Sequence, residues 1–275
     1  MASSRFLLPH GRPAVMGILN ATPDSFHKES RVQGQAAVSA GVEMVRDGAD
    51  FLDLGGQSSR PGAERIGPDA EWDRVGPVLE GLQRGLPDTP ISVDTFHAAV
   101  ARRALASGAS IINDISAGTL DPDMPGTVAE FNAPYIAMHM QGTPDTMQDR
   151  PQYEDVAAEV RHHLEGRLEA LREAGIQDIA LDPGFGFGKT LAHNYALLEG
   201  LKDLKALGCP LLVGVSRKSM IHKALGIAPA DALNGTTALH AWSLERGADI
   251  LRVHDVREAV ECVRLHQYLH GRKPD

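Results

Sequence analysis

Eight short apolar segments recur along the chain of 275 residues, and each is followed by polar or glycine-rich residues and then by a helical pattern. Segments this short and rich in Val, Ile and Leu are typical of buried β-strands, and their alternation with helices predicts parallel βαβ units. The apolar segments span residues 15–19, 51–54, 91–93, 110–112, 135–138, 179–181, 211–213 and 250–253. The candidate helices span residues 35–47, 69–84, 97–107, 124–132, 152–174, 191–207, 230–246 and 256–269.

Three of the candidate helices end next to a Gly-Ala pair, at Gly48, Gly108 and Gly247. A glycine just past a helix provides the left-handed cap that turns the chain towards the next strand. Eight strand–helix units predict an α/β fold, the (β/α)8 TIM barrel, whose chemistry lies on the loops after the strands. A doubly wound open sheet is the structural alternative. Because no linker or block of charge divides the sequence, we expect residues 1–275 to form a single domain.

The composition argues against several classes of partner. The formal net charge is −9, whereas nucleic acids and anionic membranes attract proteins with an excess of Lys and Arg. No stretch approaches the roughly 20 apolar residues of a membrane helix, and the N-terminal residues lack a signal-peptide pattern. The only two cysteines, Cys209 and Cys262, are far apart in sequence and lack a zinc-binding spacing. We therefore expect reduced thiols and a cytoplasmic protein.

Polar side chains follow all eight apolar segments. One such residue alone has an ordinary explanation, such as a helix cap or a surface ion pair. In a barrel, however, the carboxyl ends of the strands surround one pocket, so that these side chains converge. Among them are Asn20, Arg60, Asp94, Asn113, His139, Asp182, Lys218, Arg252 and His254.

Two glycine-rich patterns do not fit nucleotide binding. Residues 188–190 resemble the end of a phosphate-binding loop, but Pro183 occupies the place of its first glycine. The spacing of Gly184, Gly186 and Gly188 is also wrong for a dinucleotide fingerprint. The polar strand ends thus need another ligand.

The ordered motifs resemble those of the dihydropteroate synthases, and the resemblance runs from about Val15 to Leu269. The first loop departs from the family pattern at His27 and Lys28, and the second departs from it at Gln57. The motifs that carry the resemblance are NATPDSF, LGGQSSRPGAE, SVDTF, INDISAG, MHMQGTPDTM, LDPGFGFGKT, GVSRKSM and LRVHDV, in this order.

The resemblance implies a transferase of folate biosynthesis that joins 6-hydroxymethyl-7,8-dihydropterin pyrophosphate to p-aminobenzoate and releases pyrophosphate. A carboxylate suits the paired N–H donors of the pterin edge, and Asp182 is our choice for that contact. A guanidinium can lie on the ring face. The pterin-binding residues expected on this basis are Asp94, Asn113, Met138, Asp182, Lys218 and Arg252, and we expect Lys218, Arg252, His254 and Asp94 to be catalytic.

The leaving pyrophosphate needs cations or a metal ion to stabilise its growing charge. We expect Mg²⁺ as the cofactor, with Asn20 as its protein ligand, since magnesium keeps most of its waters and takes few ligands from the protein. The pyrophosphate-binding residues expected are Asn20, Ser59, Arg60, Arg252 and His254.

The carboxylate of p-aminobenzoate suits the start of a helix, where free N–H groups favour anions. The residues expected around this substrate are Phe26, Pro61, Phe187, Lys218 and Ser219. An arylamine is already nucleophilic, so we expect a dissociative, SN1-like displacement without an activating triad. The loops 22–34 and 55–67 are expected to act as lids that order binding, with the pterin first.

Two functions from other classes remain as alternatives. A pterin-binding paralogue without synthase activity would lack the anion and p-aminobenzoate sites, and a methyltetrahydrofolate:corrinoid methyltransferase would not need the loops TPDSF and SRPG. A barrel acting on sugar phosphates fits the strand ends less well. A homodimer formed through the later helices is implied by the resemblance alone.

Overall fold

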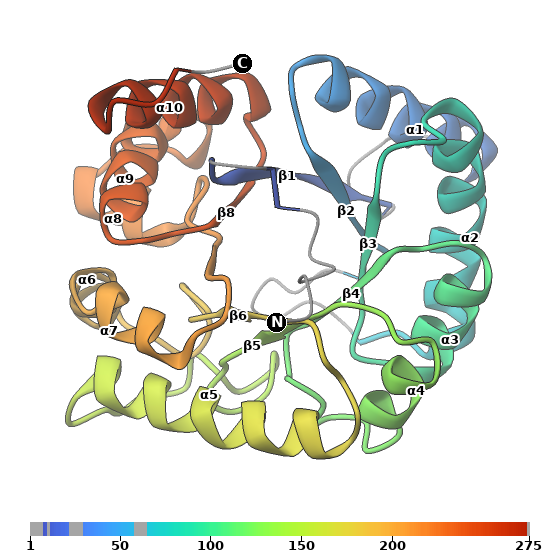
Figure 1. The fold of residues 1–275 in the computed structure, drawn as a ribbon, viewed down its shortest axis with the longest axis horizontal. Coiled ribbons are helices and arrows are strands. Elements are labelled where there is room, and N and C mark those ends of the chain that lie inside the picture. The colour runs from blue at the N-terminus through green and yellow to red at the C-terminus, as the bar shows by residue number, and fades with distance from the viewer. Residues whose placement is uncertain (1–7, 10–11, 22–29, 58–64, 274–275) are drawn as a thin grey trace.

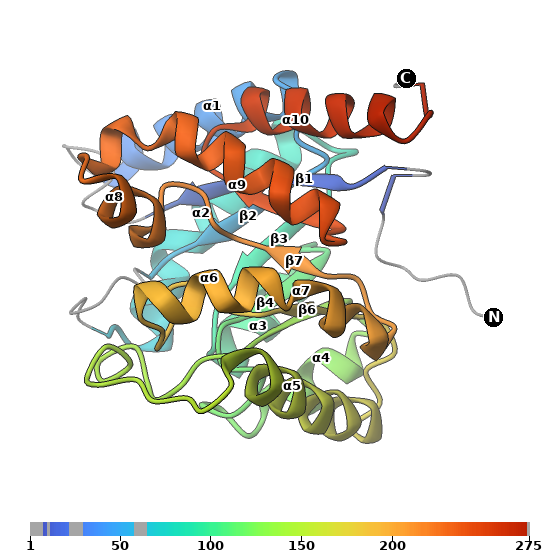
Figure 2. The ribbon, with the colours of Figure 1, turned by 90° about the vertical axis from the view of Figure 1, so that its left-hand side faces the viewer.

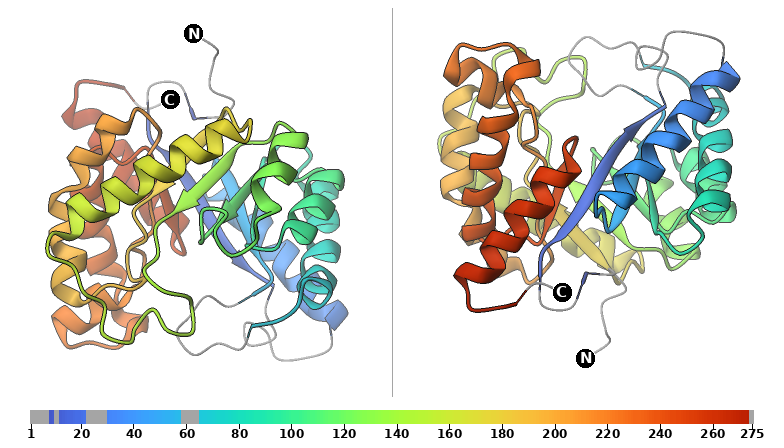
Figure 3. Two further views of the ribbon diagram at one scale, coloured as in Figure 1. Left: turned by 90° about the horizontal axis from the view of Figure 1, so that it is seen from below. Right: turned by 90° about the horizontal axis from the view of Figure 1, so that it is seen from above.

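The computed structural model describes residues 8–9, 12–21, 30–57 and 65–273. Their eight strands are all parallel and follow the order β6-β5-β4-β3-β2-β1-β8-β7. A parallel bridge between Leu181 and Leu211 joins the two ends of this order, so the sheet closes into a barrel (Figures 1 and 3). The strands are β1 (Ala14–Asn20), β2 (Phe51–Gly55), β3 (Ile91–Asp94), β4 (Ile111–Asp114), β5 (Tyr135–Met138), β6 (Ile179–Asp182), β7 (Leu212–Val213) and β8 (Ile250–Val253). Closure confirms the predicted (β/α)8 barrel and excludes the open sheet.

The helices form a ring around the barrel (Figures 1 and 2). They are α1 (Ser30–Arg46), α2 (Pro68–Gly85), α3 (Ala98–Ala106), α4 (Met124–Glu130), α5 (Val156–Glu173), α6 (Leu191–Glu199), α7 (Leu201–Leu204), α8 (Ser219–Leu225), α9 (Leu233–Glu245) and α10 (Val256–Leu269), with short 3-10 turns at Lys205–Leu207 and Pro229–Asp231. Among the described residues no helix is both long and apolar enough to cross a membrane.

The predicted helix over residues 191–207 is wrong as a single element, because it breaks at Gly200 into α6 and α7. A Cβ at Gly200 would lie 2.6 Å from the Cβ of Ala157, so α5 packs too closely there for a side chain. Asp155 explains why α5 begins later than predicted, since its side chain accepts from the N–H groups of Ala157 and Ala158. Helix α8 lies between β7 and α9 and begins at Ser219.

The inside of the barrel consists of layers set by the two-residue period of the strands. One buried apolar layer fills the barrel interior. In a strand, residues two positions apart face the same side, so the next inward layer is found two residues further along. The apolar layer consists of Ala14, Met16, Phe51, Ile111, Ile136, Ala180, Leu212 and Ile250. Two residues beyond five of these stand Asp53, Asn113, Met138, Asp182 and Arg252. The strand pattern therefore places four polar side chains and Met138 directly above this apolar layer, here called the apolar floor.

Candidate active site

Arg252 on β8 lies at the centre of a hydrogen-bond network at the carboxyl ends of the strands. Its Nε donates to Asp53 Oδ2 at 2.6 Å, and its Nη2 donates to Asp94 Oδ2 at 2.8 Å. The amide of Asn113 donates to the same oxygen of Asp53 at 2.9 Å. The strand register puts Asp94 beside Asn113, which fixes the spacing of the network. Three predicted site residues, Asp94, Asn113 and Arg252, are thus brought together.

The charged groups of this network shift one another's pKa values. Burial raises the pKa of Asp94 to about 7; the Arg252 charge opposes this shift, and the carboxylate of Asp53 adds to it. Burial alone would lower the pKa of Arg252, but Asp53 and Asp94 outweigh it and raise that pKa. Arg252 therefore stays charged, while Asp94 can change its protonation near neutral pH.

Asp53 is a site residue that the sequence reasoning missed. It is fully buried and links Arg252 to Asn113, and its Oδ1 has no hydrogen-bond partner among the residues that the structure describes. A carboxylate inside the apolar segment FLDLG was the available signal, because an unpaired charge in a strand core is costly.

Asp182 and Lys218 lie on the opposite side of the strand ends from β2. Burial raises the pKa of Asp182, and the charge of Lys218 opposes this rise. The Lys218 ammonium donates to the carbonyl of Phe185 at 2.6 Å and lies 4.9 Å from the centre of the Phe187 ring. Burial lowers the pKa of Lys218 to about 8, against the attraction of Asp182. Lys218 therefore lies between the carboxylate of Asp182 and the aromatic ring of Phe187.

The loop after β6 is held from behind by Lys189. Its buried ammonium donates to the carbonyl oxygens of Gly184 and Phe187 at 2.9 and 3.1 Å, and it lies 2.9 Å from His139 Nδ1. A Cβ at Gly184, whose φ is +71°, would lie 1.8 Å from the carbonyl oxygen of His139, so only glycine permits this approach. Lys189 and His139 are therefore structural supports of the loop that carries Phe187.

An apolar cluster borders the polar groups. Met138 is buried and packs with Phe96 and Ile115, while Met140 and Phe187 cover them partly. Met138 lies beside Asp182 in the strand register. This cluster offers a flat ring an apolar surface next to polar groups for its edge.

His254, Ser219 and Asn20 lie at the rim. The backbone N–H of His254 donates to Ser216 Oγ at 3.2 Å, and its Nδ1 lies 3.1 Å from the same oxygen. Partial enclosure of its ring and the charge of Arg252 lower the pKa of His254 to about 4, although much of the ring faces solvent. Ser219 begins α8, as expected, and Asn20 ends β1. Arg217, in contrast, has its guanidinium paired with Asp255.

Four predicted site residues, Phe26, Ser59, Arg60 and Pro61, lie outside the described residues, as do His27, Lys28 and most of the two long loops. Gln57 is described, and its Oε1 accepts from the backbone N–H of Ile66 at 2.9 Å. This atypical residue therefore ties the two ends of the second loop together.

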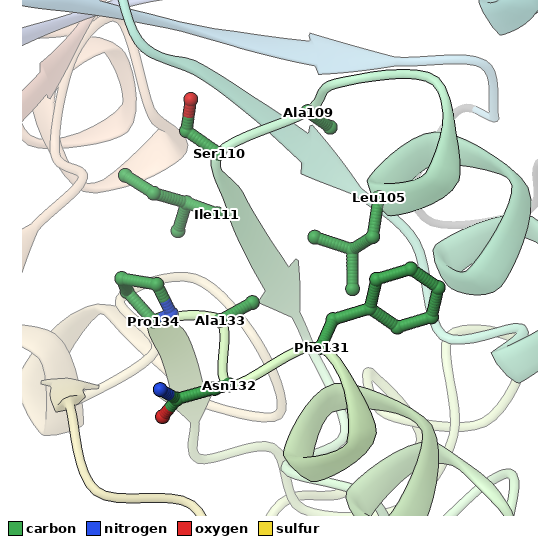
Figure 4. A pocket seen from close by; sticks show the side chains of 8 residues that line it. All are labelled: Leu105, Ala109, Ser110, Ile111, Phe131, Asn132, Ala133 and Pro134. Carbon is green, nitrogen blue, oxygen red and sulfur yellow. The ribbon is translucent and has the colours of Figure 1, made fainter.

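A hollow of about 390 Å³ lies away from this site. Figure 4 shows it where β4 begins, next to the end of α4. The residues that line it are Leu105, Ala109, Ser110, Ile111, Phe131, Asn132, Ala133 and Pro134. It faces the amino ends of the strands, where barrels hold stabilising contacts and not catalytic groups.

Comparisons with known proteins agree with this geometry. A family model described as pterin binding enzyme matches residues 16–254. The chain is 43% identical over 258 residues to dihydropteroate synthase of Synechocystis sp., with 92% of this chain and 89% of the relative covered. It is 44% identical over 256 residues to the enzyme of Escherichia coli, with 92% and 90% covered.

Solved structures show the same similarity. Dihydropteroate synthase of Xanthomonas albilineans with 4-aminobenzoic acid superimposes with a TM-score of 0.89 and 42% identity, covering 95% of this chain and 94% of that one. The same enzyme in complex with 7,8-dihydropteroate gives a TM-score of 0.86 and 40% identity, with 95% of both chains covered.

Proposed function

Because the chain belongs to the pterin-binding enzyme family, we propose that it is a dihydropteroate synthase: it condenses 6-hydroxymethyl-7,8-dihydropterin pyrophosphate with p-aminobenzoate and releases 7,8-dihydropteroate and pyrophosphate. The observation that carries the proposal is the ring of Asp94, Asn113, Asp182, Lys218 and Arg252 on an apolar floor. Relatives with the same fold hold 4-aminobenzoic acid and 7,8-dihydropteroate.

The pterin lies on the floor of the pocket, against Met138. Asp182 accepts from the paired N–H groups of the pterin's pyrimidine edge. These hydrogen bonds stabilise the charged carboxylate and so oppose the rise in pKa that burial causes. Asn113 offers a donor and an acceptor, although Asp53 already takes one of its N–H groups. Asp53 and Asp94 hold the Arg252 guanidinium by its edge, which leaves a flat face for the ring.

The p-aminobenzoate lies nearer the mouth, with Phe187 and the stem of Lys218 as one wall. Its carboxylate meets the hydroxyl and N–H of Ser219 at the start of α8. Phe26 and Pro61 are proposed as the other wall. In a dissociative displacement the bond from the exocyclic carbon to the pyrophosphate oxygen breaks first, and the apolar cluster excludes water from the resulting cation. The amine nitrogen then bonds to that carbon and loses one proton to the departing pyrophosphate.

The pyrophosphate lies above Arg252, with His254, Ser59 and Arg60 as further contacts. Asn20 is proposed as the protein ligand of a magnesium ion, and its Oδ1 lies 3.8 Å from the point where a Cβ of Gly55 would stand, at the end of β2. Mg²⁺ prefers oxygen ligands and takes few of them from the protein. When bound, Mg²⁺ would neutralise part of the charge on the leaving group.

We propose further that the protein is a homodimer of the cytoplasm. Large apolar side chains are exposed on α8, α9 and α10, which cover one side of the barrel (Figure 2). Exposed large apolar side chains on neighbouring helices are what a subunit interface would cover. They are Leu225, Trp242, Leu265, Tyr268 and Leu269, together called the apolar patch. Both cysteines are buried free thiols, which is typical of a reducing compartment.

The test is release of pyrophosphate from the pterin pyrophosphate with and without p-aminobenzoate. We expect release that depends on both substrates, that falls with Asp182→Ala by about tenfold or more, and that EDTA abolishes. Asp203→Ala, which removes an exposed carboxylate of α7, serves as the matched control and should leave the rate unchanged.

Two results would contradict the proposal. Pterin binding without any release of pyrophosphate would indicate the non-catalytic paralogue, and methyl transfer from methyltetrahydrofolate would indicate the corrinoid methyltransferase. Turnover that survives EDTA would remove magnesium from the mechanism but leave the synthase intact.

A further inference from the structure

Glu245, His266 and His270 form a side-chain cluster that the proposed reaction does not use. Glu245 is the last residue of α9, His266 lies in the last turn of α10, and His270 is the residue directly after α10. The two helices run side by side on the outside of the barrel (Figure 2), on the surface away from the strand ends. This cluster is the one group of three metal-binding side chains identified among the residues that the structure describes.

The three side chains converge on a single point. His266 and His270 are four residues apart at the C-terminal end of α10, and their ring centroids lie 4.5 Å apart. Glu245 Oε1 lies 3.4 Å from His266 Nε2 and 3.0 Å from His270 Nε2. One ligand atom from each residue lies within 4.8 Å of the other two.

We propose that Glu245, His266 and His270 bind one divalent transition-metal ion of the zinc class on the surface between α9 and α10. Zinc binds imidazole nitrogen and carboxylate oxygen at about 2.0–2.2 Å, which puts neighbouring ligands roughly 3.3 Å apart. The observed separations from Glu245 are close to that value. Water completes the coordination, since three protein ligands leave a position open.

The choice of metal follows from the ligands. Two imidazoles favour zinc, nickel or copper, whereas magnesium and calcium prefer oxygen. The Mg²⁺ proposed at Asn20 therefore does not compete for this cluster. In the single chain Glu245 is 44% and His270 46% exposed, so their hydrogen-bonded ion pair alone contributes little to stability, and a bound ion would add to it.

The scaffold is formed before any metal arrives. Buried residues of α10, among them Ala259, Cys262 and Val263, fix the helix, and the thiol of Cys262 donates to the carbonyl of Thr237 on α9. Few side chains must therefore be ordered when the ion binds, which favours affinity. The bound ion would fasten the end of α9 to α10 and stabilise both.

The experiment is a calorimetric titration of the complete chain, without a polyhistidine tag, with zinc chloride in the presence of excess Mg²⁺. We expect one zinc ion per chain and a higher Tm, because a ligand that binds only the folded state stabilises it. His266→Gln and His270→Gln should each weaken binding by about tenfold or more, and the double variant should lose the site. His162→Gln removes an exposed histidine of α5 and should change nothing.

The zinc-free Tm and turnover of each variant establish that it folds, and Glu245→Gln gives an independent test that leaves both rings in place. Equal affinity in the wild type and the double variant would overturn the proposal. One zinc ion per two chains, together with a zinc-dependent change of mass in sedimentation, would also overturn it, since the ion would then lie between copies at the apolar patch.

Discussion

Arg252 and Lys189 are two buried cations at the same end of the barrel, but their surroundings differ in kind. Arg252 donates to two carboxylates, whereas Lys189 donates to two backbone carbonyls and lies against an imidazole. The carboxylates raise the pKa of Arg252 above its ordinary value, while burial lowers the pKa of Lys189 to about 7. Burial lowers the pKa of both cations, and only the carboxylates beside Arg252 reverse the net shift.

This difference indicates different roles: the Arg252 side chain is held for a ligand, and the Lys189 side chain supports the fold. Arg252 lies at the carboxyl ends of the strands, so its positive charge is held at the place where we propose that pyrophosphate binds. Lys189 lies behind the loop after β6, and its hydrogen bonds shape the backbone that presents Phe187. We therefore expect changes at Arg252 to act on turnover and stability together, and changes at Lys189 to act mainly on the shape of one wall.

The largest effect is expected from Arg252→Met. The substitution leaves Asp53 and Asp94 buried without their cation, and breaking such a pair costs about 3–5 kcal/mol in the free energy of unfolding. Loss of the cation should also lower kcat by about a hundredfold or more. Urea denaturation and steady-state kinetics measure the two effects.

The matched control for Arg252→Met is Arg102→Met. Arg102 pairs with Glu130 on the surface, with side chains 48% and 59% exposed, so its loss should change stability by about 1 kcal/mol at most and leave kcat unchanged. Equal destabilisation by the two variants would show that the Arg252 network is not a buried one.

A smaller effect is expected from Lys189→Met. The carbonyls of Gly184 and Phe187 lose their donor, which costs about 1–3 kcal/mol in the free energy of unfolding. Because Phe187 moves with the loop, KM for p-aminobenzoate should rise more than the Kd of a pterin ligand. A parallel rise in both constants would contradict the separation of the two regions.

The smallest effect is a pH dependence. Lys189 titrates near 7 in the folded protein but at its ordinary 10.5 in the unfolded chain, so the unfolded chain binds the extra proton between these values. Stability should therefore rise with pH for the wild type relative to Lys189→Met, by about 2 kcal/mol between pH 7 and pH 9. A constant difference across this range would show that the three acceptors hold the proton on Lys189.

The sequence carried enough information for the barrel and for the ring of strand-end residues, because both follow from a short period repeated eight times. It did not identify Asp53, because Asp53 is known to point into the barrel only once Phe51, two residues earlier on β2, is known to face the interior. The sequence does not reveal the supporting role of Lys189, because its partner His139 is 50 residues away and no local pattern relates the two. The break at Gly200 likewise depends on contact with α5.

The apolar floor of the barrel affects the order in which small molecules enter and leave the pocket. It closes the interior beneath Arg252, so the pocket has a mouth but no rear exit through the described strands. Whatever occupies the depth of the pocket must have entered first and must leave last. If the proposed function holds, pyrophosphate leaves before the pterin-derived product, and departure of that product frees the enzyme for another cycle.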